Sequence, residues 1–593
     1  MNAYDYYTEL YLAKVGGEER QFAISIAECA EIFYCSARNA KLIIHKLENL
    51  SWIQWRSGRG RGNKSQIHFL KELDTFVKER INALVSRQQL DQALAFLQAH
   101  TLPQMLANQC WARVKKEFGY QTNQNKQKEQ DILRIPINRQ LTTLDPARAA
   151  ITTESHLSRQ IFDCLVNYKV DSDTFVPHLA HYWEHALDRT EWRFYLRKGV
   201  YFHSGHELTA RDVVFTVQRI ADPVNHLPCH WYFDTLLKVR QLHRYVVALT
   251  FSKPTPALLY FSSLNLAILA SDTGYHPKQM IGTGPFKIVH SSNQLLLLAR
   301  FADYFRERAL LDRIELYVAP KLVGAKKMYD VPQIQADHAT HAKRFEEKGS
   351  SYMIYNLNKS GPLQDKWLRL AMNTAIDRNK MLRELGGDRY CPSNSFIPNN
   401  SERGLKAVGD AKRIEECLGR SVYQGERLKL YYFNHQPVAV DAAWIKNALA
   451  RFGVCLEPIP WPMDQFYNDQ FVENADIILG GEVLEENVDL GLIHLFKDQS
   501  SLIRRMLDPK RLARVDQFMD LFIQAGTAKM RKEAFKQLEM YLNSEQLLIY
   551  LYHSRKEITF NAALSGIRLN AFGWAEFSKL WIKPSSSAEK LIN

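Results

Sequence analysis

The sequence predicts a multidomain α/β protein in which a small winged helix-turn-helix module precedes a much larger body. Three observations lead to this prediction. The chain has 593 residues, more than one hydrophobic core usually serves. Near its start, two short amphipathic segments are followed by alternating apolar and polar residues around a glycine-rich turn. Beyond residue 131, strand-like and helical segments alternate, which is typical of an α/β body.

Composition and charge narrow the class of protein. A hydrophobic content of 46% and a charged content of 24% are ordinary for a globular protein, and no apolar run approaches the roughly 20 residues that span a bilayer. The first twenty residues lack the basic start and apolar stretch of a secretory signal, so we expect a cytoplasmic protein with no membrane partner. The eight cysteines form no C-x-x-C pair and are expected to be reduced thiols. The net charge of +13 indicates an acidic partner.

Two short helices joined by a tight turn are predicted in residues 24–50. Apolar residues recur there at helical spacing, and Ser36 is well placed to cap the second helix. The residues expected to pack together are Ala27, Ala30 and Ile32 of the first helix and Ala40, Ile43, Ile44 and Leu47 of the second. This packing turns the opposite face of the second helix outward, as in a helix that enters the major groove of DNA.

The next segment, WIQWRSGRGRGNKSQIHFL (residues 52–70), predicts a β-hairpin because apolar and polar residues alternate on both sides of the glycines. A nucleotide-binding P-loop is a near match, but Asn63 replaces its last glycine and no helix is predicted after Lys64, where phosphates would bind. The pattern therefore favours the wing of a winged helix. A plain solvated hairpin is the alternative.

Basic residues concentrate in these elements. Between Ser36 and Lys71 there are eight cations and one acid, a local charge of +7, which suits contact with DNA phosphates. The side chains expected to contact DNA are Ser36, Arg38, Asn39, Lys41, His45, Arg59, Arg61 and Lys64. For His45 and Lys46, a solvated helix face is an equally good interpretation.

The remaining boundaries follow from composition. Residues 71–118 have a helical pattern, and residues 119–131 are polar and nearly free of hydrophobic side chains. The expected domains are therefore a winged-helix DNA-binding domain with a helical extension over 1–118, a polar linker over 119–131 and a body over 132–593.

The body contains turn formers but no recognisable catalytic group. Asp-Pro at 145–146 and Gly-Thr-Gly-Pro at 282–285 form turns, and residues 196–214 predict a strand, a turn and a capped helix. The three histidines of residues 178–185 are interpreted as solvated residues of a helix rather than metal ligands. No nucleophile elbow or paired carboxylates are found, so neither an enzyme nor a cofactor is expected.

Four stretches of the body resemble signature regions of the extracellular solute-binding proteins that serve oligopeptide, dipeptide and nickel transporters. They are residues 141–166, 176–220, 281–289 and 355–382. The resemblance implies a periplasmic-binding-protein-like body whose two α/β lobes close on a ligand, with an extra domain beside the first lobe. A transport solute-binding protein is therefore an alternative function, although it would need a secretion signal and would have no use for a basic winged helix.

Together with the N-terminal motifs, the chain resembles SgrR-type transcriptional regulators of sugar-phosphate stress over nearly its whole length. The motifs are CSARNAKLIIHKLENLSWIQW (35–55), GRGNKS (60–65), HLSRQIF (156–162) and LNAFGWAEFSKLWI (569–582). The resemblance implies a regulator that binds promoter DNA, senses a small metabolite and activates a small regulatory RNA that limits sugar uptake. A sugar phosphate is the candidate ligand, and RNA polymerase is a candidate further partner.

Candidate ligand contacts are aromatic and amide side chains of the body. Aromatic rings can stack on a sugar ring, and asparagine amides can hydrogen-bond to it. The candidates are Tyr355, Asn356, Asn358, Trp444, Trp461 and Trp574. Tyr355 and Asn358 rank first because they match the cleft-proximal strand of the solute-binding family. Core packing is the alternative for each of these residues, and Arg378, a cation available to a phosphate, is expected to be structural.

Overall fold

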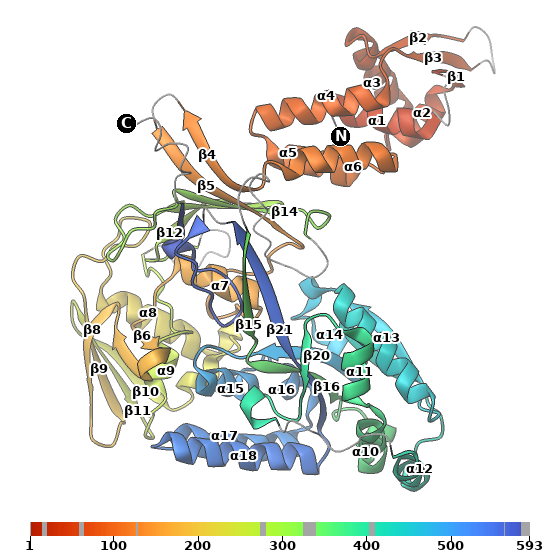
Figure 1. Ribbon diagram of the computed structural model, residues 1–593. Coiled ribbons are helices and arrows are strands. Elements are labelled where there is room, and N and C mark those ends of the chain that lie inside the picture. Colours follow the sequence, from red (N-terminus) through yellow and green to blue (C-terminus); the bar gives the residue numbers. More distant parts are fainter. Residues whose placement is uncertain are drawn as a thin grey trace.

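The computed structural model describes residues 2–14, 20–58, 64–125, 128–272, 280–323, 340–401, 410–561 and 564–582. A small N-terminal module lies beside a larger body of several sheets and their covering helices (Figure 1). Within the described residues, no helix is both long enough and apolar enough to cross a membrane.

The N-terminal module is a winged helix, as predicted. Its elements are α1 (Ala3–Lys14), β1 (Gln21–Ile24), α2 (Ile26–Ile32), α3 (Ala37–Asn49), β2 (Ile53–Arg56) and β3 (Ser65–Phe69). The strands form an antiparallel sheet in the order β1-β3-β2, in which β2 and β3 are the predicted hairpin. α1 and β1 are additional to the elements predicted from the sequence.

The core of the winged helix matches the expected packing except in α2. The buried residues of α3 are Ala40, Ile43, Ile44 and Leu47, as predicted. In α2, however, Ala27 is exposed and Cys29 is buried. A capping box between Ser25 and Glu28 fixes where this seven-residue helix begins. Because residues four apart share a helix face, Cys29 and Phe33 then face the core together, while Ala27 points away.

Three further helices connect the winged helix to the body: α4 (Leu73–Ser86), α5 (Leu90–Ala99) and α6 (Gln104–Lys115). Their hydrophobic core is continuous with that of the winged helix and reaches strand β14 (Arg313–Val318) of the body. The rings of Phe118 and Tyr317 lie 5.6 Å apart. Gln98 Nε2 donates a hydrogen bond to the Val318 carbonyl oxygen at 2.8 Å. The module is therefore docked on the body through packed side chains.

Residues 119–125 and 128–131 form strands, where the sequence predicted a linker. They make up β4 (Gly119–Asn125) and the start of β5 (Lys128–Ile137), which pair antiparallel. β4 is an edge strand of a five-stranded sheet in the order β12-β13-β14-β5-β4. An edge strand pairs its backbone on one side only and tolerates polar side chains, so its composition can be the same as that of a linker.

The first lobe of the body consists of this five-stranded sheet, one helix and an added domain. The other elements of the sheet are β12 (Phe286–Ser291) and β13 (Leu295–Arg300), and α7 (Thr152–Ile161) packs on the sheet. The added domain has a second sheet in the order β10-β11-β9-β8. Its elements are β6 (Val166–Lys169), β7 (Thr174–Pro177), β8 (Ala180–His185), β9 (Glu191–Leu196), α8 (Ala210–Ala221), β10 (Leu236–His243), β11 (Val246–Phe251) and α9 (Leu258–Ser262).

The segment with three histidines is a strand, not the predicted helix. His181 and His185 lie in β8 and His178 precedes it, so no helical turn brings two of these imidazoles together. His178 Nε2 instead lies 2.6 Å from the carboxylate of Asp163. The aromatic residues of this segment favour a strand, where they pack against neighbouring strands.

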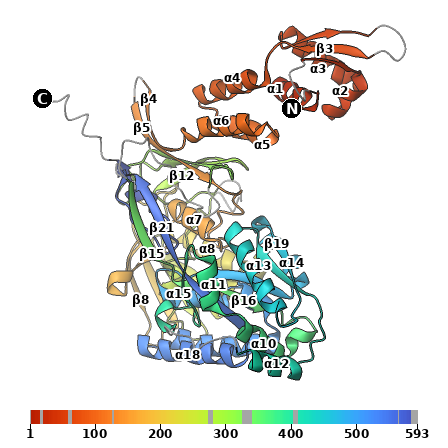
Figure 2. The ribbon, with the colours of Figure 1, turned by 45° about the vertical axis from the view of Figure 1, so that its right-hand side comes forward.

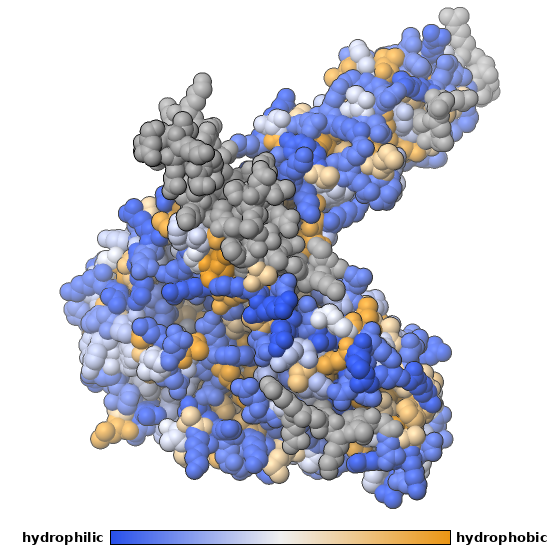
Figure 3. Space-filling model, in the orientation of Figure 1, coloured by the Kyte–Doolittle hydropathy of each residue, from blue (hydrophilic) through white to orange (hydrophobic). Residues whose placement is uncertain are grey.

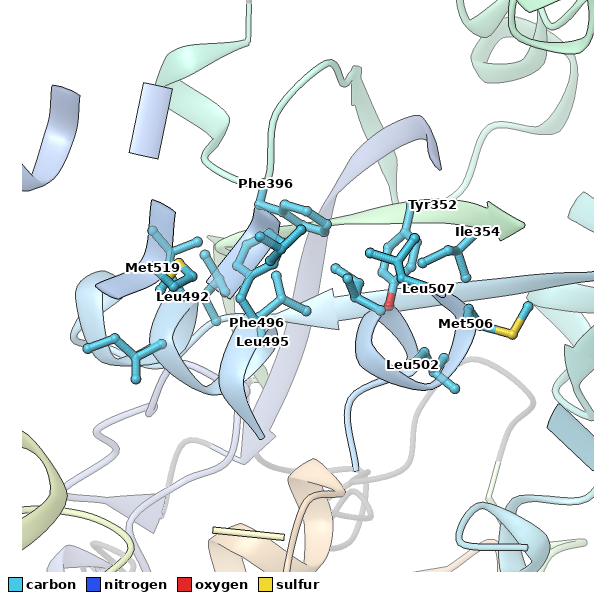
Figure 4. Close-up of a cluster of buried hydrophobic side chains, with 14 of the residues drawn as sticks. Tyr352, Ile354, Phe396, Leu492, Leu495, Phe496, Leu502, Met506, Leu507 and Met519 are labelled. Carbon is cyan, nitrogen blue, oxygen red and sulfur yellow. The ribbon is translucent and has the colours of Figure 1, made fainter. Parts of the chain in front are cut away.

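The second lobe is built on a seven-stranded sheet in the order β15-β21-β16-β20-β18-β19, with β17 also paired to β21. Its strands are β15 (Thr340–Glu346), β16 (Gly349–Tyr355), β17 (Arg389–Pro392), β18 (Leu428–Phe433), β19 (Leu456–Trp461), β20 (Ile477–Val483) and β21 (Leu548–Asn561). Its helices are α10 (Lys366–Ala375), α11 (Arg378–Leu385), α12 (Ala411–Arg420), α13 (Gln436–Ala450), α14 (Asp469–Asn474), α15 (Val488–Lys497), α16 (Leu502–Met506), α17 (Pro509–Gln524) and α18 (Ala528–Ser544). Figure 4 shows part of its core, where Tyr352, Phe496 and Leu502 pack together.

A long antiparallel pair, β15 and β21, runs from one lobe to the other (Figures 1 and 2). Ion pairs link the two strands, including Arg555 to Glu346 at 2.6 Å. Gly349, at the start of β16, has φ +133°, and a Cβ atom there would lie 1.9 Å from the Glu482 carbonyl oxygen. Only glycine therefore fits where the chain enters the second lobe.

The predicted turn at residues 282–285 has a structural role. Gly284 N donates a hydrogen bond to the Ile161 carbonyl oxygen at 2.9 Å, at the end of α7. A Cβ atom on Gly282 would lie 2.0 Å from the same oxygen. The two glycines therefore allow the turn to lie directly against α7.

Candidate DNA-binding surface and ligand cavity

The second helix of the helix-turn-helix, α3, presents a polar outward face. The Ser36 side chain accepts a hydrogen bond from Asn39 N at 3.3 Å, so Ser36 is the predicted N-cap. The side chains of Arg38, Asn39, Lys41 and His45 are all exposed, on the face opposite the core. The structure thus brings together the five candidates that the sequence placed on this helix.

The hairpin candidates divide into two groups. Arg59 and Arg61 lie outside the described residues. Lys64 is described, and its Nζ lies 2.9 Å from Glu28 Oε1. Hydrogen bonds from the Ser25 amide and the Lys64 ammonium lower the pKa of Glu28 to about 2. The charge of Lys64 is therefore matched by a carboxylate of α2, and this pair ties the hairpin to the helix-turn-helix.

Two exposed residues next to the predicted set were not among the DNA-binding candidates. Arg56 is exposed at the end of β2, on the same hairpin as Lys64. Leu42 is exposed on α3 between Arg38 and His45. The count of charges between Ser36 and Lys71 includes Arg56, so the sequence could have indicated this residue. Leu42 is uncharged, so a count of charges could not have indicated it. β2 and β3 lie at the end of the module far from the body, and the visible face of the module is largely hydrophilic (Figures 1 and 3).

The two top-ranked ligand candidates, with Asn356, hold β16 to its neighbours. Tyr355 is buried, and its hydroxyl donates to the Arg369 carbonyl oxygen at 3.4 Å. Asn356 Nδ2 donates to two backbone carbonyl oxygens, both at 2.9 Å. Asn358 Nδ2 donates to the Arg505 carbonyl oxygen at 3.0 Å. These amides already have backbone partners, so their local role is structural.

The tryptophan candidates also pack against protein. Trp461 is buried and stacks on Phe433, with ring centroids 4.9 Å apart. Trp444 Nε1 donates to a Glu384 carboxylate oxygen at 2.7 Å. Trp574 is buried and stacks on His156, with ring centroids 5.0 Å apart. None of the six predicted ligand residues lines the cavity between the lobes. Large aromatic rings gain most from burial, and Trp461 and Trp574 accordingly lie in cores, while Trp444 is half-buried.

Arg378 is structural, as expected. Its side chain is buried, and Nε donates to the Tyr550 carbonyl oxygen at 2.6 Å. A second guanidinium nitrogen donates to Asn373 Oδ1 at 2.6 Å. This cation is therefore held inside the second lobe.

A cavity of about 320 Å³ lies between the lobes, and we call it the interlobe cavity. Residues 146–152 and Ser155 contribute one wall from the first lobe, and about half of the residues between 481 and 502 contribute much of the opposite wall. The apolar part of its lining includes Tyr352, Leu495 and Leu502. These side chains belong to the core shown in Figure 4.

Carboxylates dominate the charged lining of the interlobe cavity. Glu482, Glu485 and Asp498 all line it. Arg148 is the cation in the lining, and its Nη2 donates to the Asn225 carbonyl oxygen at 2.6 Å. Arg159 lies beside the cavity and holds Glu485 at 2.6 Å. The nearby cations are thus bonded to protein groups.

Burial changes the protonation of two groups in this cavity. Burial, together with the charges of Glu485 and Asp498, raises the pKa of Glu482 to about 8. Burial lowers the pKa of His494, whose Nε2 is hydrogen-bonded to the Tyr232 hydroxyl. Near neutral pH both side chains are therefore mostly uncharged.

Direct contacts close the two lobes around the cavity. The Tyr467 hydroxyl of the second lobe donates to the Arg148 carbonyl oxygen at 2.6 Å and accepts from Ala150 N at 3.2 Å.

Beyond the Arg159–Glu485 pair lies a second, more polar cavity of about 330 Å³, lined by residues including His156 and Asp163. Within the described part of the chain, no group of three His, Cys, Asp or Glu side chains is placed to hold a metal ion.

Comparison with known families matches both parts of the chain. The family described as "Bacterial extracellular solute-binding proteins, family 5 Middle" matches residues 174–485. The family described as "Sugar transport-related sRNA regulator N-term" matches residues 3–117. The two matches follow one another along the chain, as the sequence motifs did.

Relatives among curated proteins are similar over almost the whole chain. The uncharacterized protein YhjP of Bacillus subtilis (strain 168) is 30% identical over 563 residues, which cover 94% of this chain and 96% of that protein. The HTH-type transcriptional regulator SgrR of Yersinia enterocolitica is 25% identical over 572 residues, covering 94% of this chain and 95% of that protein. SgrR of Pectobacterium atrosepticum is 24% identical over 578 residues, covering 94% of this chain and 95% of that protein.

Solved structures confirm the fold of the body. The dipeptide-binding protein of Pseudoalteromonas sp. SM9913, in complex with Met-Leu, has a TM-score of 0.66 and 18% identity, covering 76% of this chain and 100% of that one. The oligopeptide-binding protein AppA of Bacillus subtilis also has a TM-score of 0.66 and 18% identity, covering 77% of this chain and 100% of that one. The body thus has the predicted periplasmic-binding-protein-like fold.

Proposed function

Because this chain belongs to the SgrR-type regulators, in which an SgrR N-terminal domain precedes a family 5 solute-binding body, we propose that it regulates transcription in response to a small molecule. The winged helix binds promoter DNA, and the interlobe cavity binds the ligand. The observation that carries the proposal is the union, in one chain, of an exposed basic helix-turn-helix and a cavity between two lobes. The proposed role of the first part is to bind DNA and that of the second is to bind a small molecule. Neither role needs a catalytic step.

Exposure and charge indicate which side chains contact DNA. We assign phosphate contacts to Lys41 and Arg56, which are exposed on α3 and on the hairpin. Base contacts fall to Arg38 and Asn39, near the N-terminal end of α3. Lys64 has a smaller part in binding because Glu28 already matches its charge. Arg59 and Arg61, from the basic wing sequence, belong with the phosphate contacts.

The DNA-binding half of the proposal can be tested through the dependence of affinity on salt. Each lost phosphate contact reduces the slope of log affinity against log salt by about one. We therefore expect Lys41→Ala and Arg56→Ala each to flatten the slope by about one, and Lys64→Ala to change it less. Lys529→Ala, exposed at the start of α18 in the second lobe, is the control that leaves the slope unchanged. A slope unaffected by both Lys41→Ala and Arg56→Ala would remove this face from the interface.

The charged residues of the cavity lining indicate which ligand charge the cavity favours. A sugar phosphate, the ligand implied by resemblance, would place about two negative charges beside the carboxylates of Glu485 and Asp498. Arg148 and Arg159, the nearby cations described above, are already bonded to protein groups. We therefore favour a neutral or cationic ligand over a sugar phosphate.

A charge series on one sugar scaffold tests this choice. Glucosamine, glucose and glucose 6-phosphate present an ammonium, no charge and a phosphate on the same ring. A ligand that binds only the folded protein raises its unfolding temperature. We expect the shift for the full chain to fall in the order glucosamine, glucose, glucose 6-phosphate. The largest shift with glucose 6-phosphate would restore the sugar phosphate as the ligand.

The remaining parts of the proposal follow from the family. By likeness to the SgrR relatives, the regulated product is a small RNA connected with sugar transport. A protein that acts on promoter DNA works in the cytoplasm, where RNA polymerase is a further partner. A transport solute-binding protein is the rival, and cell fractionation separates the two functions because the rival would be found outside the cytoplasm.

A further inference from the structure

Leu42 stands at the centre of the outward face of α3. Its side chain is 62% exposed. Arg38 is four residues before it and His45 three residues after it, so the three side chains share one face of the helix. Asn39 and Lys41 flank this face. Leu42 is thus an apolar position within an otherwise polar surface.

The core of the winged helix does not require a leucine at this position. Four other residues of α3 fill the inward side: Ala40, Ile43, Ile44 and Leu47. Leu42 points away from them and contributes little to burial in the free protein. A leucine here is therefore available to contact whatever approaches the outward face of α3.

The charge around Leu42 identifies DNA as the partner that approaches. Residues 36–71 carry a local charge of +7, which complements a phosphate backbone. The edges of base pairs in the major groove present hydrogen-bond donors and acceptors, and the C5-methyl group of thymine is the apolar group among them. A leucine on a helix in that groove finds its apolar partner in this methyl group.

We propose that Leu42 reads a thymine of the target site through the C5-methyl group, beside the hydrogen-bonding contacts of Arg38 and Asn39. The inference rests on the proposed binding of DNA and adds the base that this position selects. It predicts that DNA sites bound by the full chain contain a thymine whose methyl group contributes to affinity.

Replacing thymine by deoxyuridine tests the contact because it removes only the methyl group. Duplexes are first selected from a randomised DNA pool with the full chain. Each thymine of the best site is then replaced singly by deoxyuridine, and affinity is measured for the wild-type chain and for Leu42→Ala. Wild type should lose roughly fourfold in affinity at one position, the effect of one buried methyl-sized group. Leu42→Ala should bind the two duplexes equally.

Leu50→Ala is the matched control, because Leu50 is also an exposed leucine but caps the far end of α3. This variant should keep the wild-type preference for thymine over deoxyuridine. Selection of a site in which no deoxyuridine replacement weakens wild-type binding would overturn the inference and leave DNA binding intact. A preference that survives in Leu42→Ala would assign the methyl group to another residue. Failure of any sequence to be enriched would contradict the proposed function itself.

Discussion

At the scale of single residues, burial decides the chemistry of the interlobe cavity. Glu482 lines the cavity together with Glu485 and Asp498, and its pKa is raised to about 8. An ordinary glutamate has a pKa of about 4.3. The same residue on an exposed helix would be ionised at every physiological pH, so its neighbours and its burial, not its identity, determine its charge here.

The raised pKa of Glu482 predicts a stability that falls with rising pH. The unfolded chain loses this proton near pH 4.3, whereas the folded chain keeps it until about pH 8. The contribution of Glu482 to the free energy of unfolding is therefore present at low pH, and it is lost as the pH rises through the pKa of Glu482 in the folded protein. Glu482→Gln cannot titrate, so its unfolding temperature should rise relative to wild type between about pH 5 and about pH 9.

The pH profile of Glu482→Gln should be read against a variant that leaves the cavity unchanged. Glu473→Gln, at an exposed position on α14, serves this purpose and should follow the wild-type profile. The titratable groups that act on position 482 are Glu485, Asp498 and Tyr352, and His494 lines the same cavity. Parallel profiles for wild type and Glu482→Gln would contradict the assignment of the raised pKa.

At the scale of elements, the sequence pattern was sufficient to predict a helix or strand where one face of the element is buried and the other is exposed. α3 shows this, because its buried and exposed residues alternate with the helical period and Ser36 caps its start. β4 and β8 show the opposite. β4 is a polar edge strand, and the histidines of β8 were expected on a helix although the aromatic residues of this segment favour a strand. Their strand conformation depends on antiparallel pairing with β5 and β9, the strands that follow them in the sequence, and the composition of β4 or β8 alone does not record this pairing.

At the scale of the whole molecule, packed elements connect the interlobe cavity to the winged helix. Residues 152 and 155 of α7 line the cavity, while Leu157 and Ile161 of the same helix pack with β5 and β14. The end of β14 in turn meets Phe118 and Gln98 of the helical extension. A change in lobe position that shifts α7 therefore has a direct route to the DNA-binding module.

This route predicts coupling between ligand and DNA. If the ligand changes affinity for promoter DNA, promoter DNA must change affinity for the ligand by the same factor, typically about 5- to 150-fold in allosteric proteins. Ligand binding to the full chain should be measured with and without saturating promoter DNA. Gln98→Ala removes the hydrogen bond to Val318 and should reduce the coupling factor while leaving DNA affinity without ligand unchanged.

One control variant and two alternative outcomes complete the coupling experiment. Lys529→Ala, far from the docked module, should leave the coupling factor at its wild-type value. Equal ligand affinities with and without DNA would mean that the body acts after DNA binding, for example by contact with RNA polymerase. An unchanged factor in Gln98→Ala would mean that the packed rings of Phe118 and Tyr317 suffice for the coupling.

The sequence by itself determined the winged helix, its cap, its outward basic face and the two-lobed fold of the body, because each depends on local periodicity or on motifs that survive in distant relatives. Only the tertiary structure decided which side chains line the cavity. Tyr355, Trp461 and Trp574 lie in cores, while Glu482 and Asp498 face the cavity. A cavity wall is assembled from loops and helix ends of two lobes far apart in the chain, and no local pattern records which of their residues will meet.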